Sequence, residues 1–215
     1  MKFQFYGATD LGRKRELNED RFLILEKEKV MVVCDGMGGH AAGEVASRVA
    51  AETIETIFEM GLVKIKPLLT EMDTSLPELA QRLISAIRLA NRRIYNTALE
   101  NTAQRGMGTT VVALALSQDG LVCIAHVGDS RAYRLRNQKL NPLTIDHSFV
   151  AELVQDREIS EDEAKAFGPK NVITRALGTK YAVKVDIRIE PIQEGDLFLL
   201  CSDGLTGQVG NEMME

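Results

Sequence analysis

Three aspartates in this sequence each follow a short apolar run and stand beside a glycine. They are Asp35, Asp129 and Asp203. The runs before them, residues 30–34, 121–127 and 197–201, are rich in β-branched and aliphatic side chains and predict buried strands. One such strand end is usually a turn, but three suggest a shared rim of carboxylates. Oxygen ligands without a Cys/His cluster favour Mg²⁺ or Mn²⁺ over Zn²⁺.

The first of these strand ends, Asp35 to Gly39, is the most specific. Glycines allow the backbone to adopt positive φ and to approach a ligand closely. A dinucleotide-binding loop would use Gly36, Gly38 and Ala41, but Asp35 would then repel the pyrophosphate. The Gly-Lys-Ser/Thr of a Walker phosphate loop is absent here. The segment therefore favours a hard cation over a nucleotide phosphate.

The polar loop at residues 10–20 has a basic part at residues 13–15 and ends with Glu19 and Asp20. Charge pattern alone is compatible with a solvated surface turn. The functional interpretation is that the basic part grips an anion while the acidic end joins a cation site. Both ions would then share one cleft.

Composition limits the classes of function. A chain of 215 residues with 45% hydrophobic content can bury a full core, and we expect one domain over residues 1–215. The net charge of −5 argues against general binding to nucleic acid or to anionic membranes. No signal sequence or membrane-spanning stretch is evident, so we expect a soluble, cytoplasmic protein.

The three cysteines, Cys34, Cys123 and Cys201, lie in apolar runs and are expected to be reduced and buried. A cysteine phosphatase requires Cys-x₅-Arg, but the positions six residues after these cysteines are His40, Asp129 and Gly207. Catalysis by a cysteine nucleophile of that class is excluded.

The elements that must position these groups follow from periodicity. We expect strands over residues 3–9, 21–27, 30–34, 109–117, 121–127, 132–136, 183–190 and 197–201. Amphipathic helices are expected from Glu44 to Met60 and, after a Ser75/Glu78 capping box, to about Glu100. The polar segment 149–167 is expected to be a mobile flap over the cleft. His126, as a lone histidine, is expected to point along its strand into packing or a hydrogen bond rather than to bind metal.

Seven motifs, in order along the chain, resemble those of the metal-dependent protein serine/threonine phosphatases of the 2C type, in the bacterial form. They are Gly12-Arg-Lys-Arg-Glu-Leu-Asn-Glu-Asp20, Val33-Cys-Asp-Gly-Met-Gly-Gly-His40, Gly108-Thr-Thr110, Val127-Gly-Asp-Ser-Arg-Ala-Tyr133, Leu143-Thr-Ile-Asp-His147, Ile173-Thr-Arg-Ala-Leu-Gly178 and Cys201-Ser-Asp-Gly-Leu205. The resemblance covers nearly the whole chain. It implies an α+β fold, a four-layer α-β-β-α sandwich of two antiparallel sheets with flanking helices.

The resemblance also implies a centre of two Mn²⁺ or Mg²⁺ ions with a third, weaker site. Asp35 matches the bridging carboxylate, Asp20 and the Gly36 carbonyl match ligands of one ion, and Asp203 matches a ligand of the other. Asp129 matches the third site, and Glu19 is a candidate substitute ligand. Among catalytic residues, Arg15 matches the arginine that grips the substrate phosphate, and His40 resembles a proton donor.

The implied function is hydrolysis of phosphoserine and phosphothreonine in phosphorylated proteins by a metal-activated water. A serine/threonine kinase and its substrates are the expected partners, and a monomer is expected. The family's final Asp-Asn strand is not found before Glu215, which suggests a truncated C-terminal end. The alternative is therefore a phosphatase-like module that binds phosphoprotein without efficient turnover.

Overall fold

The computed structural model describes all residues except Met1, Lys14, 39–41, 61–74, 158–159, 161–162 and 164–171. Its larger sheet is antiparallel, in the order β1-β2-β4-β5-β8, with the short β3 paired to β2. These strands are β1 (Asp20–Leu25), β2 (Val30–Met37), β3 (Gly108–Thr109), β4 (Val111–Leu116), β5 (Leu121–Val127) and β8 (Asp186–Pro191). The smaller antiparallel sheet has the order β7-β6-β9. Its strands are β6 (Arg131–Arg136), β7 (Lys139–Pro142) and β9 (Leu197–Cys201).

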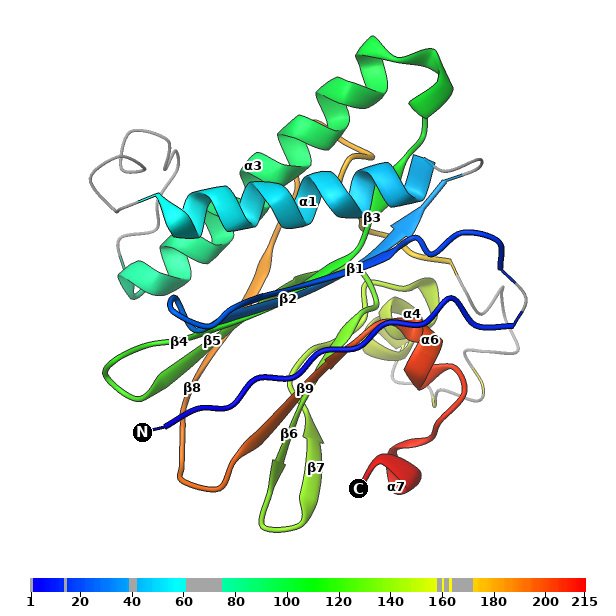
Figure 1. Cartoon of the computed structure of the whole chain (residues 1–215). Coiled ribbons are helices and arrows are strands. Elements are labelled where there is room, and N and C mark those ends of the chain that lie inside the picture. Colours follow the sequence, from blue (N-terminus) through cyan, green and yellow to red (C-terminus); the bar gives the residue numbers. More distant parts are fainter. Residues whose placement is uncertain are drawn as a thin grey trace.

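Two long helices, α1 (Ala42–Glu59) and α3 (Glu78–Glu100), cover one face of the larger sheet (Figure 1). The smaller sheet packs on its other face. The remaining described helices are short: η2 (Thr102–Gln104), α4 (Phe149–Arg157), α6 (Asp203–Thr206) and α7 (Asn211–Met214). Two antiparallel sheets with helices packed outside confirm the expected α+β class.

The central strands of the larger sheet, β4 and β5, are buried on both faces, and their residues alternate between two cores. In β4, Val111, Ala113 and Ala115 pack under the helices. The intervening Val112 and Leu114 pack toward the smaller sheet. Alternation arises because successive side chains of a strand point to opposite faces. This two-sided burial explains why β4 and β5 read as continuous apolar runs in the sequence.

The first expected strand, residues 3–9, is not a strand, although the chain there is extended. Phe3 and Phe5 nevertheless pack against the core between the sheets. The alternation that predicted a strand thus reflects side-chain packing without a ladder of backbone hydrogen bonds.

Several strand boundaries also differ from expectation. The strand expected at residues 21–27 is β1, which begins at Asp20 and ends at Leu25, and β2 continues past Asp35 to Met37. The strand expected from residue 183 begins only at Asp186, which pairs with His126. Since β5 ends one residue later at Val127, residues 183 and 184 lie beyond the end of the strand with which they would pair.

The helix start near residue 78 is correct, but its expected capping box is wrong. Pro77 occupies the N-cap of α3, and no side chain caps that position. Proline suits a helix start because its fixed φ is close to the helical value. The first amphipathic helix is confirmed as α1, with Ala46, Ala50 and Ile57 buried.

The expected flap is described only in part. Residues Phe149–Arg157 form α4, while most of the rest of the segment lies outside the described residues. Among the described residues, no helix is both long enough and apolar enough to cross a membrane.

Candidate metal centre

Asp20 and Asp35 are brought together by the first strand pair. They are register partners in β1 and β2, so their side chains point to the same face of the sheet. Asp35 alternates in phase with Met31 and Val33, which pack toward the smaller sheet. The two carboxylates therefore face the gap between the two sheets.

Asp203 and Asp129 approach this point from the smaller sheet. Asp203 begins α6 directly after β9, and Asp129 lies in the connection between β5 and β6. Burial, followed by the negative charges of Asp20, Asp203 and Asp129, raises the pKa of Asp35 to about 8. Burial and the charge of Asp203 raise the pKa of Asp129 to about 6. The four aspartates thus form one electrostatically coupled group, which we call the carboxylate cluster.

A hydroxyl network, absent from the sequence interpretation, fixes the backbone of Asp35. The Thr110 hydroxyl accepts a hydrogen bond from the Asp35 N–H at 3.1 Å, and the Thr109 hydroxyl donates to the Asp35 carbonyl at 2.9 Å. Thr110 Oγ1 also lies 2.7 Å from Ser130 Oγ. The Gly108-Thr-Thr110 motif marked these threonines without indicating a role.

Ser202 holds the side chain of Asp20, at the start of β1, as the two threonines hold the backbone of Asp35. Its hydroxyl donates to Asp20 Oδ2 at 2.8 Å and so links the end of β9 to the start of β1. The second oxygen, Asp20 Oδ1, is buried and has no hydrogen-bond partner. A buried carboxylate oxygen without a donor needs a positive partner.

The donor set fits a divalent cation. The four aspartates come from separate segments and the charges of the other three act on Asp35, and Asp20 Oδ1 is left unsatisfied. Among the described residues, no three of these carboxylates have oxygens within 4.8 Å of one another, so the donors match a divalent cation in kind rather than in a closed geometry. Carboxylates and backbone carbonyls are the ligands that Mg²⁺ and Mn²⁺ prefer. The charges that shift Asp35 upward are all carboxylates, so an ion would relieve their repulsion.

The chain matches the family model described as Protein phosphatase 2C over residues 11–214. The chain belongs to the protein phosphatase 2C family. It is 41% identical over 210 residues to the serine/threonine phosphatase stp of Listeria innocua. The aligned region covers 96% of this chain and 79% of the Listeria protein. The chain is thus a phosphoprotein phosphatase of the serine/threonine type.

Solved structures agree with this membership. The crystal structure of the Mycobacterium tuberculosis serine/threonine phosphatase PstP/Ppp matches with a TM-score of 0.82 and 32% identity, covering 96% of this chain and 81% of that one. A structure of the PstP catalytic domain in complex with two manganese ions matches with a TM-score of 0.78 and 32% identity, over 95% and 79% of the two chains.

In this phosphatase, close packing of the backbone explains Gly36. A Cβ at Gly36 would overlap the carbonyl of Gly43, at the start of α1, and lie 2.7 Å from the Glu19 carbonyl. The expected positive φ is found at Gly38 (141°), whereas Gly36 continues the strand and Gly39 lies outside the described residues. Gly36 is thus required by space rather than by its φ.

The remaining candidate residues lie at different places. Arg15 is exposed, in the loop five residues before Asp20, and His40 lies outside the described residues. The Glu19 carboxylate packs against Gly43 at the N-terminus of α1, where the helix dipole favours a negative charge. Glu19 is not among the charges that shift the pKa of Asp35.

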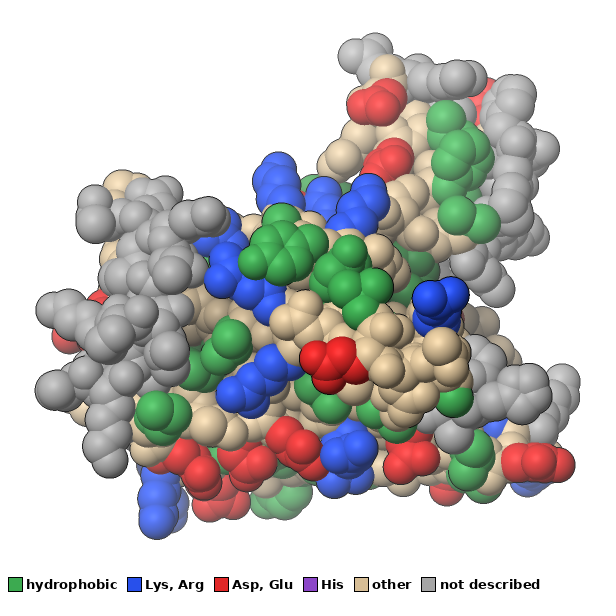
Figure 2. Space-filling model, turned by 90° about the horizontal axis from the view of Figure 1, so that it is seen from above, with side chains coloured by type: hydrophobic (Ala, Val, Ile, Leu, Met, Phe, Trp, Pro, Cys, Tyr) green, Lys and Arg blue, Asp and Glu red, His purple; other side chains and the backbone are tan. Residues whose placement is uncertain are grey.

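The face of the larger sheet that carries α1 and α3 is opposite the face toward which Asp20 and Asp35 point. Figure 2 looks down on that side, where Lys and Arg side chains gather over the middle and Asp and Glu side chains lie along the lower margin. A groove of about 420 Å³ there is lined by residues of α1 and α3, among them Glu52, Thr53 and Arg93. None of the four aspartates lines this groove. Asp35, for example, points to the opposite face of the sheet.

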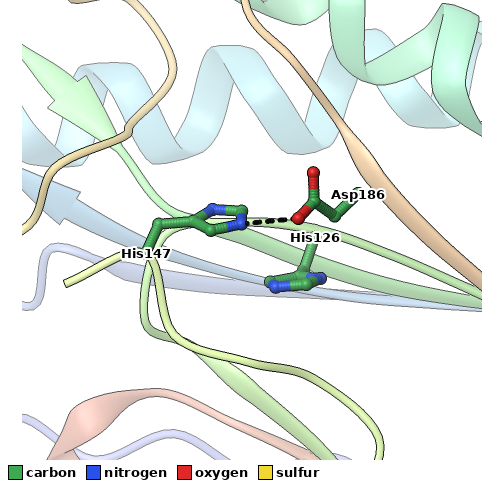
Figure 3. Close-up of side chains that lie close together, drawn as sticks. All are labelled: His126, His147 and Asp186. Carbon is green, nitrogen blue, oxygen red and sulfur yellow. Dashed lines mark hydrogen bonds and ion pairs between the residues drawn. The ribbon is translucent and has the colours of Figure 1, made fainter. Parts of the chain in front are cut away.

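His126 is not the lone histidine that the sequence suggested. It is buried, its Nε2 lies 2.7 Å from the Ile145 carbonyl oxygen, and its ring stacks on His147 with centroids 4.6 Å apart. The expected hydrogen bond is therefore correct. Among the described residues, His126, His147 and Asp186 form a group whose ligand atoms lie within 4.8 Å of one another (Figure 3).

The carboxylate cluster should make the metal-free phosphatase less stable as pH rises from 6.5 to about 8. Asp35 has its pKa raised on folding, so the folded state binds a proton that the unfolded state releases, and stability falls until that proton is lost. The slope is up to about 1.4 kcal/mol per pH unit. The buried His126 and His147 have lowered pKa values, so they affect stability only below pH 6.5. There they make the protein more stable as pH rises, which is the opposite of the effect of Asp35.

Melting temperatures in EDTA across this pH window test the expectation. Asp35→Asn should flatten the curve. A melting temperature that stays constant or rises with pH in the metal-free wild-type protein would contradict the repulsion within the cluster.

Proposed function

We propose that this phosphatase hydrolyses phosphoserine and phosphothreonine in proteins, with two Mn²⁺ or Mg²⁺ ions held by the carboxylate cluster. Asp35 would bridge them, Asp20 and the Gly36 carbonyl would ligate one, and Asp203 the other. Asp129 would contribute to a third, weaker site. The observation that carries the proposal is geometric: Asp20 and Asp35 are register partners on one face of the sheet, and Asp20 Oδ1 is buried there without a hydrogen-bond partner.

Bound divalent ions of this kind lower the pKa of a water molecule and so supply a hydroxide nucleophile near neutral pH. The chain's own residues hold the arrangement. Thr109 and Thr110 fix the backbone of Asp35 from both sides of its peptide, and Ser202 orients the Asp20 carboxylate. Rigid support of ligands in this way tunes metal affinity and geometry.

Two further residues act on the substrate in this proposal. Arg15 binds the phosphate through the planar pair of donors of its guanidinium. His40 donates a proton to the serine or threonine oxygen as the bond from phosphorus to that oxygen breaks. The water oxygen forms the new bond to phosphorus, so no covalent enzyme intermediate is required.

The alternative, a module that binds phosphoprotein without efficient turnover, is not favoured, because relatives such as the stp protein carry phosphatase names. A turnover assay with a phosphothreonine peptide and Mn²⁺ separates the two. Steady release of phosphate supports the proposed enzyme. Tight peptide binding without phosphate release at any Mn²⁺ concentration would support the binding module.

Its partners are proposed to be phosphorylated proteins, together with a serine/threonine kinase that phosphorylates the same targets. We propose that the enzyme acts in the cytoplasm as a monomer. Light scattering after size exclusion checks the oligomeric state, and the phosphoproteome of a deletion strain identifies the targets.

Arg15→Ala should raise KM for phosphorylated substrates while leaving Mn²⁺ affinity nearly unchanged, because a cation that holds phosphate does not ligate metal. A lost charge-assisted hydrogen bond costs about 1.5–3 kcal/mol, which corresponds to a rise in KM of roughly 10- to 150-fold. The measurement is steady-state kinetics on the phosphothreonine peptide, paired with a Mn²⁺ titration.

Arg13→Ala is the matched control, since Arg13 is an exposed arginine of the same loop. Equal effects of the two substitutions would show that the loop acts through its general charge. A loss of Mn²⁺ affinity in Arg15→Ala would contradict the role in phosphate binding.

A further inference from the structure

The group formed by His126, His147 and Asp186 is near the carboxylate cluster in the chain, because Asp129 follows His126 by only three residues. His147 makes two hydrogen bonds to Gly128, in the connection between β5 and β6. Its backbone N–H donates to the Gly128 carbonyl at 3.0 Å, and its ring Nδ1 accepts from the Gly128 N–H at 3.0 Å. Gly128 is thus gripped at both of its backbone polar groups by one residue.

We propose that His147 is a positioning residue that holds the Gly128–Asp129 turn and thereby places the Asp129 carboxylate for metal binding. The inference rests on the assignment of Asp129 as a ligand in the proposed function. It adds a residue, outside the ligand set, whose side chain acts on the ligand through the backbone.

The hydrogen bonds of His147 determine which ring nitrogen carries the proton. Because Nδ1 accepts from the Gly128 N–H, it has no proton, and the neutral ring carries its proton on Nε2. Nε2 can then donate to Asp186 Oδ2, 3.1 Å away (Figure 3). Asp186 accepts in turn from Arg175 Nη1 at 2.9 Å. The carboxylate thus orients the imidazole, as a carboxylate that accepts from the second ring nitrogen of a histidine commonly does.

The same pattern argues against a metal ion between the two histidines and Asp186. A metal would need the lone pair of a ring nitrogen of His147, yet Nδ1 uses its lone pair for Gly128 and Nε2 carries a proton. The guanidinium of Arg175 also lies 2.9 Å from His147 Nε2, where a second cation would be repelled. The group is better explained as a support for the turn.

The turn in question is packed against the support of Asp35. Gly128 has a φ of 110°, and a Cβ there would lie 2.7 Å from the side chain of Thr110. Thr110 is the residue whose hydroxyl accepts from the Asp35 N–H. A change in the position of Gly128 would therefore disturb the placement of both Asp129 and Asp35.

A second clamp lies beside the first. Arg131, two residues after Asp129, makes three hydrogen bonds of 2.6 to 3.1 Å to the carboxylate of Asp146, the neighbour of His147. The segment Asp146-His147 thus holds the β5–β6 connection on both sides of Asp129. One side is held by an ion pair and the other by the histidine ring.

Two amide substitutions separate the two contacts of the ring. In His147→Asn the side-chain oxygen lies where Nδ1 was and can accept from Gly128, but it cannot reach Asp186. In His147→Gln the amide reaches toward the position of Nε2 and can donate to Asp186, but no acceptor remains at the position of Nδ1. The inference expects asparagine to preserve the turn and glutamine to release it.

The first measurement is hydrogen exchange of the Gly128 amide, followed by NMR in the metal-free protein. Loss of its acceptor should speed exchange by about tenfold or more in His147→Gln, whereas His147→Asn stays close to the wild type. The second measurement is Mn²⁺ affinity followed by electron paramagnetic resonance. The weakest Mn²⁺ site should lose about 10- to 100-fold in affinity in His147→Gln.

The third arm repeats the Mn²⁺ titration in an Asp129→Asn background. If His147 acts through Asp129, His147→Gln has no further effect on metal binding there. An effect of the same size in that background, or equal Gly128 exchange in the glutamine and asparagine variants, would overturn the inference. Unchanged metal binding in Asp129→Asn alone would overturn the ligand assignment in the proposed function, and with it the metal-binding part of this inference. The exchange measurement, made without metal, reports on the clamp independently.

Discussion

Replacing Asp35 with asparagine should remove tight Mn²⁺ binding and lower kcat by more than about a hundredfold. Loss of a residue that only supports a ligand costs about 10- to 100-fold in metal affinity or activity, so loss of the ligand proposed to be shared by the two ions should cost more. Asparagine keeps the shape of aspartate but removes the charge that three neighbouring carboxylates make costly. Calorimetric Mn²⁺ titration and phosphate release measure the two effects.

The same variant should gain stability without metal, which separates this effect from misfolding. Removing one charge from the carboxylate cluster relieves repulsion, so metal-free Asp35→Asn should melt at a higher temperature than the wild type at pH 8. Sites built from crowded charges commonly trade stability for activity in this way. Asp119→Asn is the charge-matched control, since Asp119 is exposed in the turn between β4 and β5. Equal Mn²⁺ affinity in Asp35→Asn and the wild type would mean that Asp35 is a strand residue that does not bind the metal.

Much of the site could be anticipated because its signals are local. An apolar run that ends beside an acidic residue and a glycine predicts both the strand and the group at its end, and β5 and β9 have the expected bounds. The hairpin between β4 and β5 depends on equally local residues, since its turn lies between the two expected strands and Gly120 there has a φ of 77°. These features depend on neighbours in the sequence, so pattern alone recovers them.

The supports of the site could not be anticipated because they join distant segments. Ser202 and Asp20 are 182 positions apart, and Thr110 and Asp35 are 75 apart. Nothing in the spacing of a serine or a threonine indicates which carboxylate or amide it will reach. The partnership of His126 with His147 was missed for the same reason, since it depends on the return of the chain after β7.

The helix and strand errors have a different cause. Ser75 and Glu78 have the spacing of a capping box, but Pro77 between them begins the helix and takes the N-cap position. The alternation at residues 3–9 correctly indicates that Phe3 and Phe5 face a core. It does not indicate whether a partner strand lies beside this segment. Periodicity thus indicates burial more directly than hydrogen bonding.

Metal removal should abolish phosphatase activity, while alkylation of thiols should leave it intact. Cys34, Cys123 and Cys201 are buried, and burial raises the pKa of the Cys123 and Cys201 thiols to about 11. Burial raises the pKa of Cys34 still further, so all three remain protonated near neutral pH and are poor nucleophiles. None of the three thiols is therefore suited to act as the nucleophile, which is consistent with the proposed use of a metal-activated water.

The experiment measures phosphate release after treatment with EDTA, after readdition of Mn²⁺ or Mg²⁺, and after treatment of the folded enzyme with iodoacetamide. Activity should fall to background in EDTA and return with the ions, while the alkylated enzyme keeps the wild-type rate. Asp35→Asn serves as the reference for the rate without a competent metal site, since added Mn²⁺ should not rescue it. Full turnover in EDTA, or inactivation by iodoacetamide in the folded state, would refute the metal mechanism, because either result requires a nucleophile that the carboxylates do not control.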